Sequence, residues 1–116
     1  YKNMTGVVTW GQEDYLENEF NKMKTKFSDN GIPVILGEFA ASLRDELPEA
    51  IKATHKESRC YYLKSVTAKA LEKGMVPFYW DNGGTGNNAS GLFNRNTLTV
   101  VHDDALNALM EGAGKK

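Results

Sequence analysis

Residues 33–41, with the sequence PVILGEFAA, decide how the chain folds. The apolar run Val34, Ile35, Leu36 is typical of a strand that is covered on both faces, as strands are in parallel sheets. This run leads directly to a glycine and then to a carboxylate, Glu38. A charged group is costly to desolvate unless it has a partner or a use. Glu38 therefore needs an explanation that an ordinary surface glutamate would not need.

The segment before this strand predicts an amphipathic helix. Asp14 and Glu17 resemble a capping box at its start. Apolar side chains then recur at helical spacing, and Asn30-Gly31 provides a left-handed stop before Pro33. The apolar stripe consists of Leu16, Phe20, Met23 and Phe27.

A long connection follows the strand and predicts a short helix that starts at Pro48. A second long helix is expected over about residues 56–73, with Gly74 as its C-cap. One face of that helix is apolar and is formed by Tyr62, Leu63, Val66 and Ala70.

The segment MVPFYW, residues 75–80, predicts a second short buried strand. It ends in Asp81-Asn82 and continues into a loop rich in glycine and asparagine, residues 81–91. That loop lacks the spacing of a phosphate-binding motif, so we interpret it as a connection between a strand and a helix. A last helix is expected after Asp103, with Leu106, Leu109 and Met110 buried.

Helices that alternate with apolar strands predict an α/β fold with βα units on a parallel sheet. Two strands cannot form such a sheet alone, and a closed eight-stranded barrel takes about 250 residues. We therefore expect residues 1–116 to be one C-terminal fragment, about the last two to three βα units, of a single (β/α)8 TIM barrel. A chain that folds only with a partner segment is the alternative. The start at Tyr1, without an initiator methionine, also favours a piece of something longer.

Composition narrows the function. The formal net charge is −1 without a block of like charge, which argues against binding to nucleic acid or anionic lipid. No apolar stretch approaches the roughly 20 residues that cross a bilayer. Cys60 is the single cysteine, and His55 and His102 are far apart, so no disulfide or metal-ligand spacing is visible. We expect no metal and no cofactor.

Two polar strand ends are the candidate site. Working residues of parallel α/β folds gather at the carboxyl ends of strands, where Glu38 and Trp80 fall. Adjacent strands lie about 4.8 Å apart, so the two ends must share one surface. An indole stacks on the apolar face of a sugar ring, and a carboxylate attacks at the anomeric carbon. The pair therefore predicts carbohydrate chemistry.

The strings PVILGEFAA and PFYWDNGG, with GLFNR downstream, resemble the C-terminal end of glycoside hydrolase family 5, and most of all its endoglucanase-like cellulases. The resemblance covers about residues 30–95 well. It implies a secreted (β/α)8 barrel, extracellular or periplasmic, whose signal region is not in this chain. It also implies hydrolysis of a β-1,4-linked glucan, polysaccharide or oligosaccharide, with retention of configuration.

The resemblance implies roles for individual residues. Glu38 corresponds to the catalytic nucleophile at the end of the seventh strand. Trp80 corresponds to the tryptophan beside the cleavage point, and Asn82 is expected near the sugars. Tyr1 and Trp10 fall in the loop after the sixth strand, where the family often has cleft aromatics, so the resemblance implies that they bind substrate.

The family's acid/base glutamate belongs to a strand that this chain lacks. Retaining hydrolysis needs two carboxyl groups about 5 Å apart, so the chain alone should be inactive and needs the missing N-terminal barrel segment. Asp81 is an alternative second carboxylate. However, successive residues of a strand point in opposite directions, so a hydrogen bond to the loop backbone suits Asp81 better.

Other readings remain open from sequence. Glu38 can be a structural acid that pairs with Arg44, and Trp80 can belong to the barrel core. The fragment can also be a non-catalytic carbohydrate-binding piece that uses Trp80 and Trp10 as platforms. A third possibility is a β-mannanase of the same fold.

Overall fold

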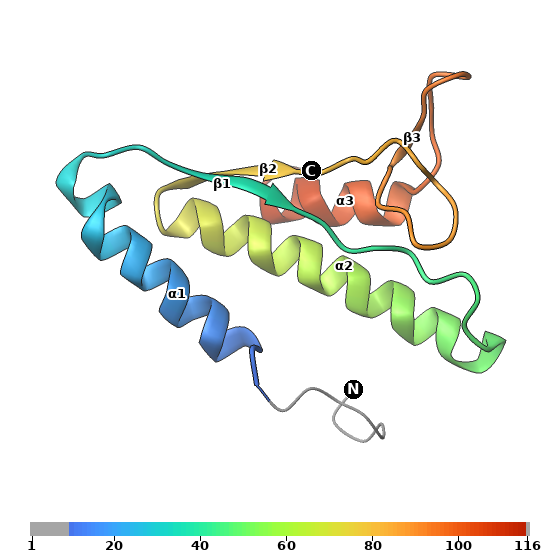
Figure 1. Cartoon of the computed structure of the whole chain (residues 1–116), viewed down its shortest axis with the longest axis horizontal. Coiled ribbons are helices and arrows are strands. Elements are labelled where there is room, and N and C mark those ends of the chain that lie inside the picture. Colours follow the sequence, from blue (N-terminus) through green and yellow to red (C-terminus); the bar gives the residue numbers. More distant parts are fainter. Residues whose placement is uncertain (1–9, 116) are drawn as a thin grey trace.

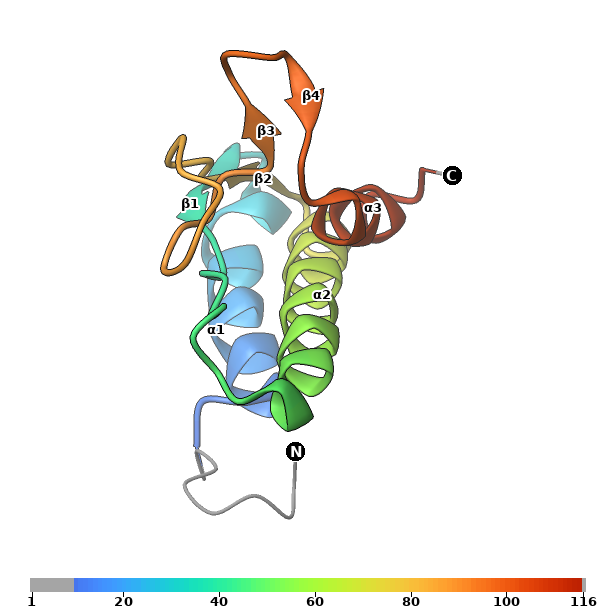
Figure 2. The same cartoon turned by 90° about the vertical axis from the view of Figure 1, so that its right-hand side faces the viewer.

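The computed structural model describes residues 10–115, so Tyr1 lies outside the described residues. Figure 1 shows β1 and β2 next to each other above the helices, and Figure 2 shows α2 between α1 and α3. The elements in chain order are α1 (Glu13–Lys26), the 3-10 helix η1 (Ser28–Asn30), β1 (Val34–Phe39), α2 (Glu49–Glu72), β2 (Met75–Tyr79), β3 (Phe93–Asn94), β4 (Thr99–Val100) and α3 (Asp103–Gly112).

The two apolar strands pair in parallel, as their sequence predicts. Val34 lies opposite Met75, and Leu36 lies opposite Pro77. The long helix α2 connects them, because antiparallel partners can use a tight hairpin but parallel strands need a crossover. The interpretation of the chain as βα units is therefore confirmed for this pair of strands.

One face of the β1–β2 sheet packs on the helices. Phe39 and Met75 are only 8% and 3% exposed, and they pack with Leu63 and Val66 of α2. The other face carries large apolar side chains that are exposed to solvent. Ile35 is 62% exposed and Phe78 is 51% exposed. Within the part of the chain that the structure describes, the sheet is covered on one side only.

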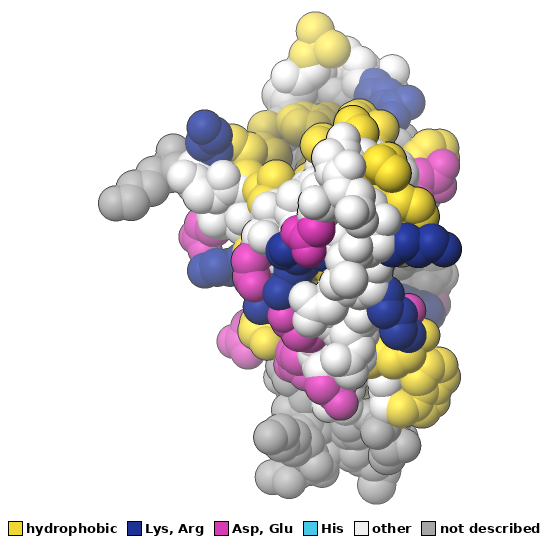
Figure 3. All heavy atoms as spheres, turned by 90° about the vertical axis from the view of Figure 1, so that its left-hand side faces the viewer, with side chains coloured by type: hydrophobic (Ala, Val, Ile, Leu, Met, Phe, Trp, Pro, Cys, Tyr) yellow, Lys and Arg dark blue, Asp and Glu magenta, His cyan; other side chains and the backbone are white. Residues whose placement is uncertain are grey.

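Figure 3 shows how charged and hydrophobic side chains are distributed on one face of the molecule. Acidic and basic side chains lie next to one another over the helices. Hydrophobic side chains gather higher on that face, toward the sheet and the β3–β4 hairpin, and a second hydrophobic patch lies lower, on the right of the view. One of the ion networks over the helices joins α1 to α2. The carboxylate of Glu17 lies 2.8 Å from Nζ of Lys69 and 2.5 Å from Nζ of Lys73.

Helix boundaries differ from the predictions in two places. The short helix at Pro48 and the helix from residue 56 are one continuous helix, α2, because no glycine or proline interrupts residues 49–72. Helix α1 begins at Glu13, one residue before Asp14, so the prediction of Asp14 as the N-cap is wrong. The expected stops are present, since Gly31 and Gly74 both have a positive φ, 74° and 75°.

Helix α3 buries small residues and not the large ones that its sequence suggests. Ala105 and Ala108 are buried, whereas Leu106 and Leu109 are half-buried and Met110 is exposed. A Cβ atom at Gly112 would lie 2.6 Å from the carbonyl oxygen of Lys64. Small side chains let α3 approach the backbone of α2 closely, so the predicted burial of Met110 is wrong.

The β3–β4 hairpin projects away from the helices (Figure 2) and lies beyond the carboxyl ends of β1 and β2 (Figure 1). Its strands have two residues each, and the sequence prediction missed it. At its tip, Leu98 is 88% exposed and has a positive φ of 56°. None of the helices within residues 10–115 has both the length and the apolar character required to cross a membrane.

Candidate functional site at the carboxyl ends of the two strands

A β-bulge sets the direction of the Glu38 side chain. Between Leu36 and Phe39 the register with β2 shifts, so that Gly37 and Glu38 both lie opposite the single residue Phe78. A bulge of this kind re-aims a side chain and is uncommon in parallel pairs. Phe39 lies on the helix side, and Glu38 is exposed on the side that Phe78 shares. Gly37 is the sequence signal for this bulge, because an isolated glycine inside a strand often marks one.

Two aromatic rings fix the register just below the site. Phe39 lies opposite Tyr79, and their rings meet edge to face with centroids 5.8 Å apart. The next residue, Trp80, donates its backbone N–H to the carbonyl of Phe39 at 2.9 Å. Since side chains alternate along a strand, Trp80 leaves the sheet on the face opposite Tyr79. This is the face of Glu38, and the indole is 51% exposed.

Glu38 and Trp80 lie near one another at the carboxyl ends of the two strands. One strand step across and two residues along put their Cα atoms on the order of 8 Å apart. Within residues 10–115, the carboxylate of Glu38 has no hydrogen bond and no ion pair, and it does not pair with Arg44. The backbone N–H of Arg44 instead donates to His55 Nε2 at 2.9 Å.

Asp81 belongs to the loop and not to the open face. Its two carboxylate oxygens accept hydrogen bonds from the backbone N–H of Gly83 at 2.7 Å and of Leu92 at 2.8 Å. Arg95 adds an ion pair at 3.3 Å. Partial burial raises the pKa of Asp81, but these hydrogen bonds and the Arg95 charge outweigh it and lower the pKa below its usual value. The interpretation of Asp81 as an acceptor for the loop backbone is confirmed.

Asn82 and Ser90 close the loop on itself. The side-chain oxygen of Asn82 accepts the backbone N–H of Gly84 at 3.2 Å and of Ser90 at 3.1 Å. Ser90 is buried, and its hydroxyl donates to the carbonyl of Trp80 at 2.9 Å. The amide oxygen of Asn82 is therefore engaged in holding the backbone that follows Trp80. Its expected place near the sugars stays a prediction.

The connection after β1 is tied to the same loop. Leu43 exchanges two backbone hydrogen bonds with it, donating to Ala89 at 2.8 Å and accepting from Asn88 at 2.7 Å. The side-chain oxygen of Asn87 accepts the backbone N–H of Asp45 at 2.9 Å. The segments that follow Glu38 and Trp80 therefore form one hydrogen-bonded rim beside the strand ends.

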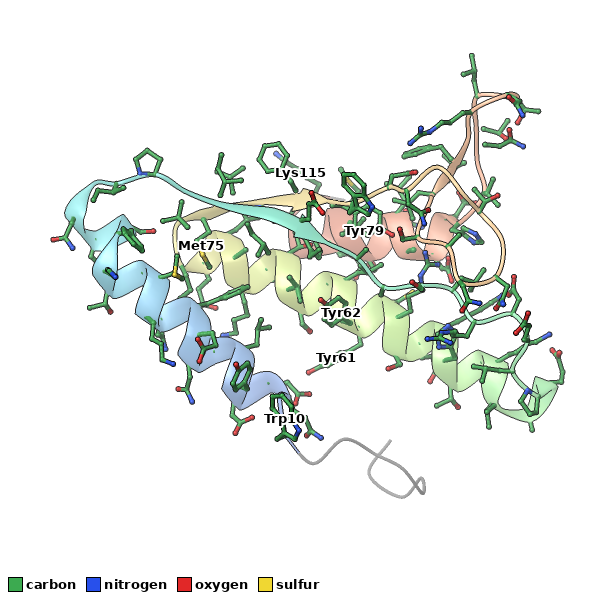
Figure 4. All side chains as sticks on the ribbon, in the orientation of Figure 1. Trp10, Tyr61, Tyr62, Met75, Tyr79 and Lys115 are labelled. Carbon is green, nitrogen blue, oxygen red and sulfur yellow. The ribbon has the colours of Figure 1, made fainter. Side chains whose placement is uncertain are left out.

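Trp10 is not brought to this rim. It is exposed at the start of α1, where its ring meets that of Tyr15 at 5.8 Å. Figure 4 shows Trp10 beyond α2 from Tyr79, which lies at the end of β2 between the sheet and the helices. A role for Trp10 in the cleft stays a prediction, as does that of Tyr1.

The sequence interpretation missed three residues that support the site: Ser90, Arg95 and Arg59 of α2. Arg59 had a visible signal. It lies four residues before Leu63 and seven before Val66, on the stripe that the helix buries. Ser90 and Arg95 gave no signal, because loop hydrogen bonds between distant residues have no sequence period. No group of three histidine, cysteine or acidic side chains within residues 10–115 is arranged to hold a metal ion.

Comparison with known proteins identifies the family. The model of the family described as Cellulase (glycosyl hydrolase family 5) matches residues 1–86. Endoglucanase A of Paenibacillus barcinonensis is 41% identical over 104 residues, which are 90% of this chain and 25% of that protein. The xyloglucan-specific endo-β-1,4-glucanase of Bacteroides ovatus is 33% identical over 91% of this chain and 20% of its own length.

Solved structures agree with this result. A family 5 xyloglucanase from Paenibacillus pabuli, in complex with ligand, superimposes with a TM-score of 0.80 at 44% identity, over 90% of this chain and 28% of that one. A Bacteroides ovatus xyloglucanase in complex with a XXXG heptasaccharide gives 0.84 at 31% identity, over 93% and 22%. The chain thus spans about a quarter of the length of these relatives. The family and these neighbours imply a (β/α)8 barrel, and the chain belongs to glycosyl hydrolase family 5.

Proposed function

We propose that this chain is the C-terminal part of a retaining β-1,4-glucanase in which Glu38 is the nucleophile. The observation that carries the proposal is the bulge that places Glu38 opposite Phe78, on the open face of the sheet beside the end of β2. A strand that ends in an unpaired carboxylate next to an exposed indole suits attack on a sugar that stacks on the indole.

The mechanism is double displacement. An acid on the missing part of the barrel protonates the glycosidic oxygen while a Glu38 carboxylate oxygen attacks the anomeric carbon. The bond to the leaving sugar breaks and a glycosyl ester of Glu38 forms. The deprotonated acid then activates a water, which attacks the same carbon and releases Glu38. Asp81 does not supply the acid, because both of its oxygens hold the loop backbone. The isolated chain is therefore inactive.

The names of the relatives support a glucan as the substrate. They are described as endoglucanases and as enzymes specific for xyloglucan. A soluble or insoluble β-1,4-glucan, with or without side branches, is the substrate class that we assign, in preference to mannan. Such polymers are too large to enter a cell, so we place the complete enzyme outside the cytoplasm. Product analysis on mannan and on barley glucan tests the choice of polymer.

Substitution of Glu38 tests the mechanism. In the complete enzyme that contains this chain, Glu38→Ala should lower kcat by at least about a thousandfold without loss of the fold, because the intermediate cannot form. Added azide should restore turnover and give the glycosyl azide with inverted configuration, since azide occupies the space of the lost carboxylate. A Glu38→Ala enzyme that keeps more than a small part of its kcat would disprove the assignment.

A non-catalytic binding role is the second candidate, and the exposed indole of Trp80 is the observation that favours it. Affinity electrophoresis in a glucan gel separates the two. A binding piece should be retarded by the gel and lose that retardation on Trp80→Ala, while it hydrolyses nothing even with the rest of the barrel present.

A further inference from the structure

Arg59 is the most deeply buried charged residue among those that the structure describes. It lies on α2 and is 3% exposed. A guanidinium carries five N–H donors and cannot lose its proton in a protein, so burial is costly unless acceptors surround it. Leucine or methionine at this position would fill the space between helix and sheet without that cost. The arginine therefore calls for a role beyond packing.

One side of the guanidinium holds the chain that leaves β1. Arg59 Nε donates to the carbonyl of Ala41 at 2.9 Å. Ala41 comes three residues after Glu38, just beyond the end of the strand. The contact fixes the direction of the chain where it leaves the bulge, on the helix side of the sheet.

Arg59 Nη1 and Nη2 are buried, and neither has a hydrogen-bond partner among the described residues. The nearby phenol of Tyr79 feels the positive charge: burial raises the pKa of Tyr79, and Arg59 opposes that rise. The Tyr79 hydroxyl donates to the carbonyl of Ser90 at 2.5 Å. Ser90 in turn donates its hydroxyl to the carbonyl of Trp80 at 2.9 Å.

These interactions form one path beneath the site. A hydrogen bond joins Arg59 to Ala41, the Arg59 charge acts on the Tyr79 phenol without a hydrogen bond, and hydrogen bonds continue from Tyr79 through Ser90 to Trp80. We propose that Arg59 is a positioning residue that holds the carboxyl ends of β1 and β2 in one geometry, so that Glu38 and Trp80 engage the same sugar. This inference rests on the proposed function. Arg59 does not touch the substrate, because it lies on the helix side of the sheet and Glu38 lies on the other.

The test uses the complete enzyme and counts its competent sites. A 2-deoxy-2-fluoro cello-oligosaccharide with a good leaving group traps the glycosyl-enzyme and gives the fraction of active sites. We expect Arg59→Met to lower kcat per trapped site by about tenfold to a hundredfold, because a nucleophile displaced by about 1 Å loses rate on that scale. KM should stay within about threefold, since Trp80 keeps its backbone hydrogen bond to Phe39.

Two further variants separate positioning from a purely structural role. Arg59→Lys keeps the charge and one donor, and should recover at least about fivefold of the lost kcat. Tyr79→Phe removes the hydroxyl that holds Ser90, and should lower kcat per trapped site by itself. The double variant Arg59→Met/Tyr79→Phe should lose less than the product of the two single effects, because both variants break the same path.

A purely structural arginine would lower the number of trapped sites and leave kcat per trapped site within about twofold of the wild type, and that result overturns the proposal. Should Arg59→Met fail to fold, Tyr79→Phe decides alone: wild-type kcat per trapped site in that variant also overturns it. Failure here is distinct from failure of the proposed function. If Arg59 is not a positioning residue, Glu38→Ala still abolishes hydrolysis, whereas an active Glu38→Ala enzyme removes the nucleophile itself.

Discussion

The two faces of the β1–β2 sheet differ in what covers them. The helix face is closed by α2, and its side chains Phe39 and Met75 are buried. The opposite face is equally apolar, with Ile35, Val76 and Phe78, yet these side chains are about half exposed or more. The β1–β2 pair thus has the composition of a sheet covered on both sides and the structure of one covered on a single side. In the complete barrel that we propose, the open face becomes the interior, and Glu38 and Trp80 emerge at its carboxyl end.

The largest expected effect comes from a charge placed on the open face. In the complete enzyme, Phe78→Asp should lower the free energy of unfolding by at least about 3 kcal/mol, because the barrel interior would bury an unpaired carboxylate. Thermal or urea unfolding measures it. Leu98→Asp at the exposed hairpin tip is the matched control and should stay within about 0.5 kcal/mol of the wild type. Equal, small effects of both substitutions would mean that nothing covers this face.

Removal of the indole should have the next largest effect. Trp80→Ala in the complete enzyme should lower kcat/KM by about 30-fold, since roughly 80 Å² of apolar contact with a sugar is worth about 2 kcal/mol at 25 cal/mol per Å². Steady-state kinetics on a soluble glucan measures the change. Trp10→Ala is the comparison at the start of α1, away from the rim, and we expect it to lower kcat/KM by less than threefold. A larger loss at Trp10 than at Trp80 would place the groove elsewhere.

Substitution of Asp81, which anchors the loop, should have a somewhat smaller effect. Asp81→Asn puts an amide N–H₂ where one of two backbone N–H groups now donates, and should cost about 1–2 kcal/mol in the free energy of unfolding. Because folding lowers the pKa of Asp81 from 3.8, the wild-type contribution is fully present above that value and is lost as pH falls through the lower one. Urea unfolding should show that the free energies of unfolding of the wild type and the variant converge as the pH falls. A constant difference across this range would contradict the anchor.

The smallest effect belongs to the ion network that joins α1 to α2, away from both faces of the sheet. Hydrogen bonds from Lys69 and Lys73 lower the pKa of Glu17 from 4.5 to about 2. Its contribution to stability is thus present above pH 4.5 and is lost as pH falls through about 2. Glu17→Gln should flatten this part of the curve of Tm against pH, with less difference at high salt because the side chains are open to solvent. Unchanged pH dependence would show that the network contributes nothing.

The sequence predicted the parts of the fold that repeat along the chain. Apolar runs at residues 34–36 and 75–80 predicted the two strands, and their lack of alternation predicted the parallel pairing. The stripe of α2 was also predicted, and Leu63, Val66 and Ala70 are buried as expected, but the prediction included Tyr62 and left out the buried Arg59. Tyr62 is exposed in the structure. Helical periodicity identifies the buried face but does not show which polar side chain that face contains.

What the sequence could not predict depends on contacts between distant residues. The hairpin at 93–100 is stabilised by the side chain of Asn94, which accepts the backbone N–H groups of Asn96 and Thr97. Its two-residue strands are too short for any alternation to show. The rim beside the site is held by hydrogen bonds from Ser90 to Trp80 and from Asp45 to Asn87, which join separate segments. Such pairs become visible only in three dimensions.

The central claim is that Glu38 becomes covalently bonded to the sugar, and one measurement tests it directly. The complete enzyme is inactivated with a 2-deoxy-2-fluoro cello-oligosaccharide and digested with pepsin at low pH, and the labelled peptide is sequenced by mass spectrometry. We predict one fluoroglycosyl ester per enzyme, on Glu38. A label on any other carboxylate, Asp81 included, or complete inactivation without a covalent adduct, would contradict the account.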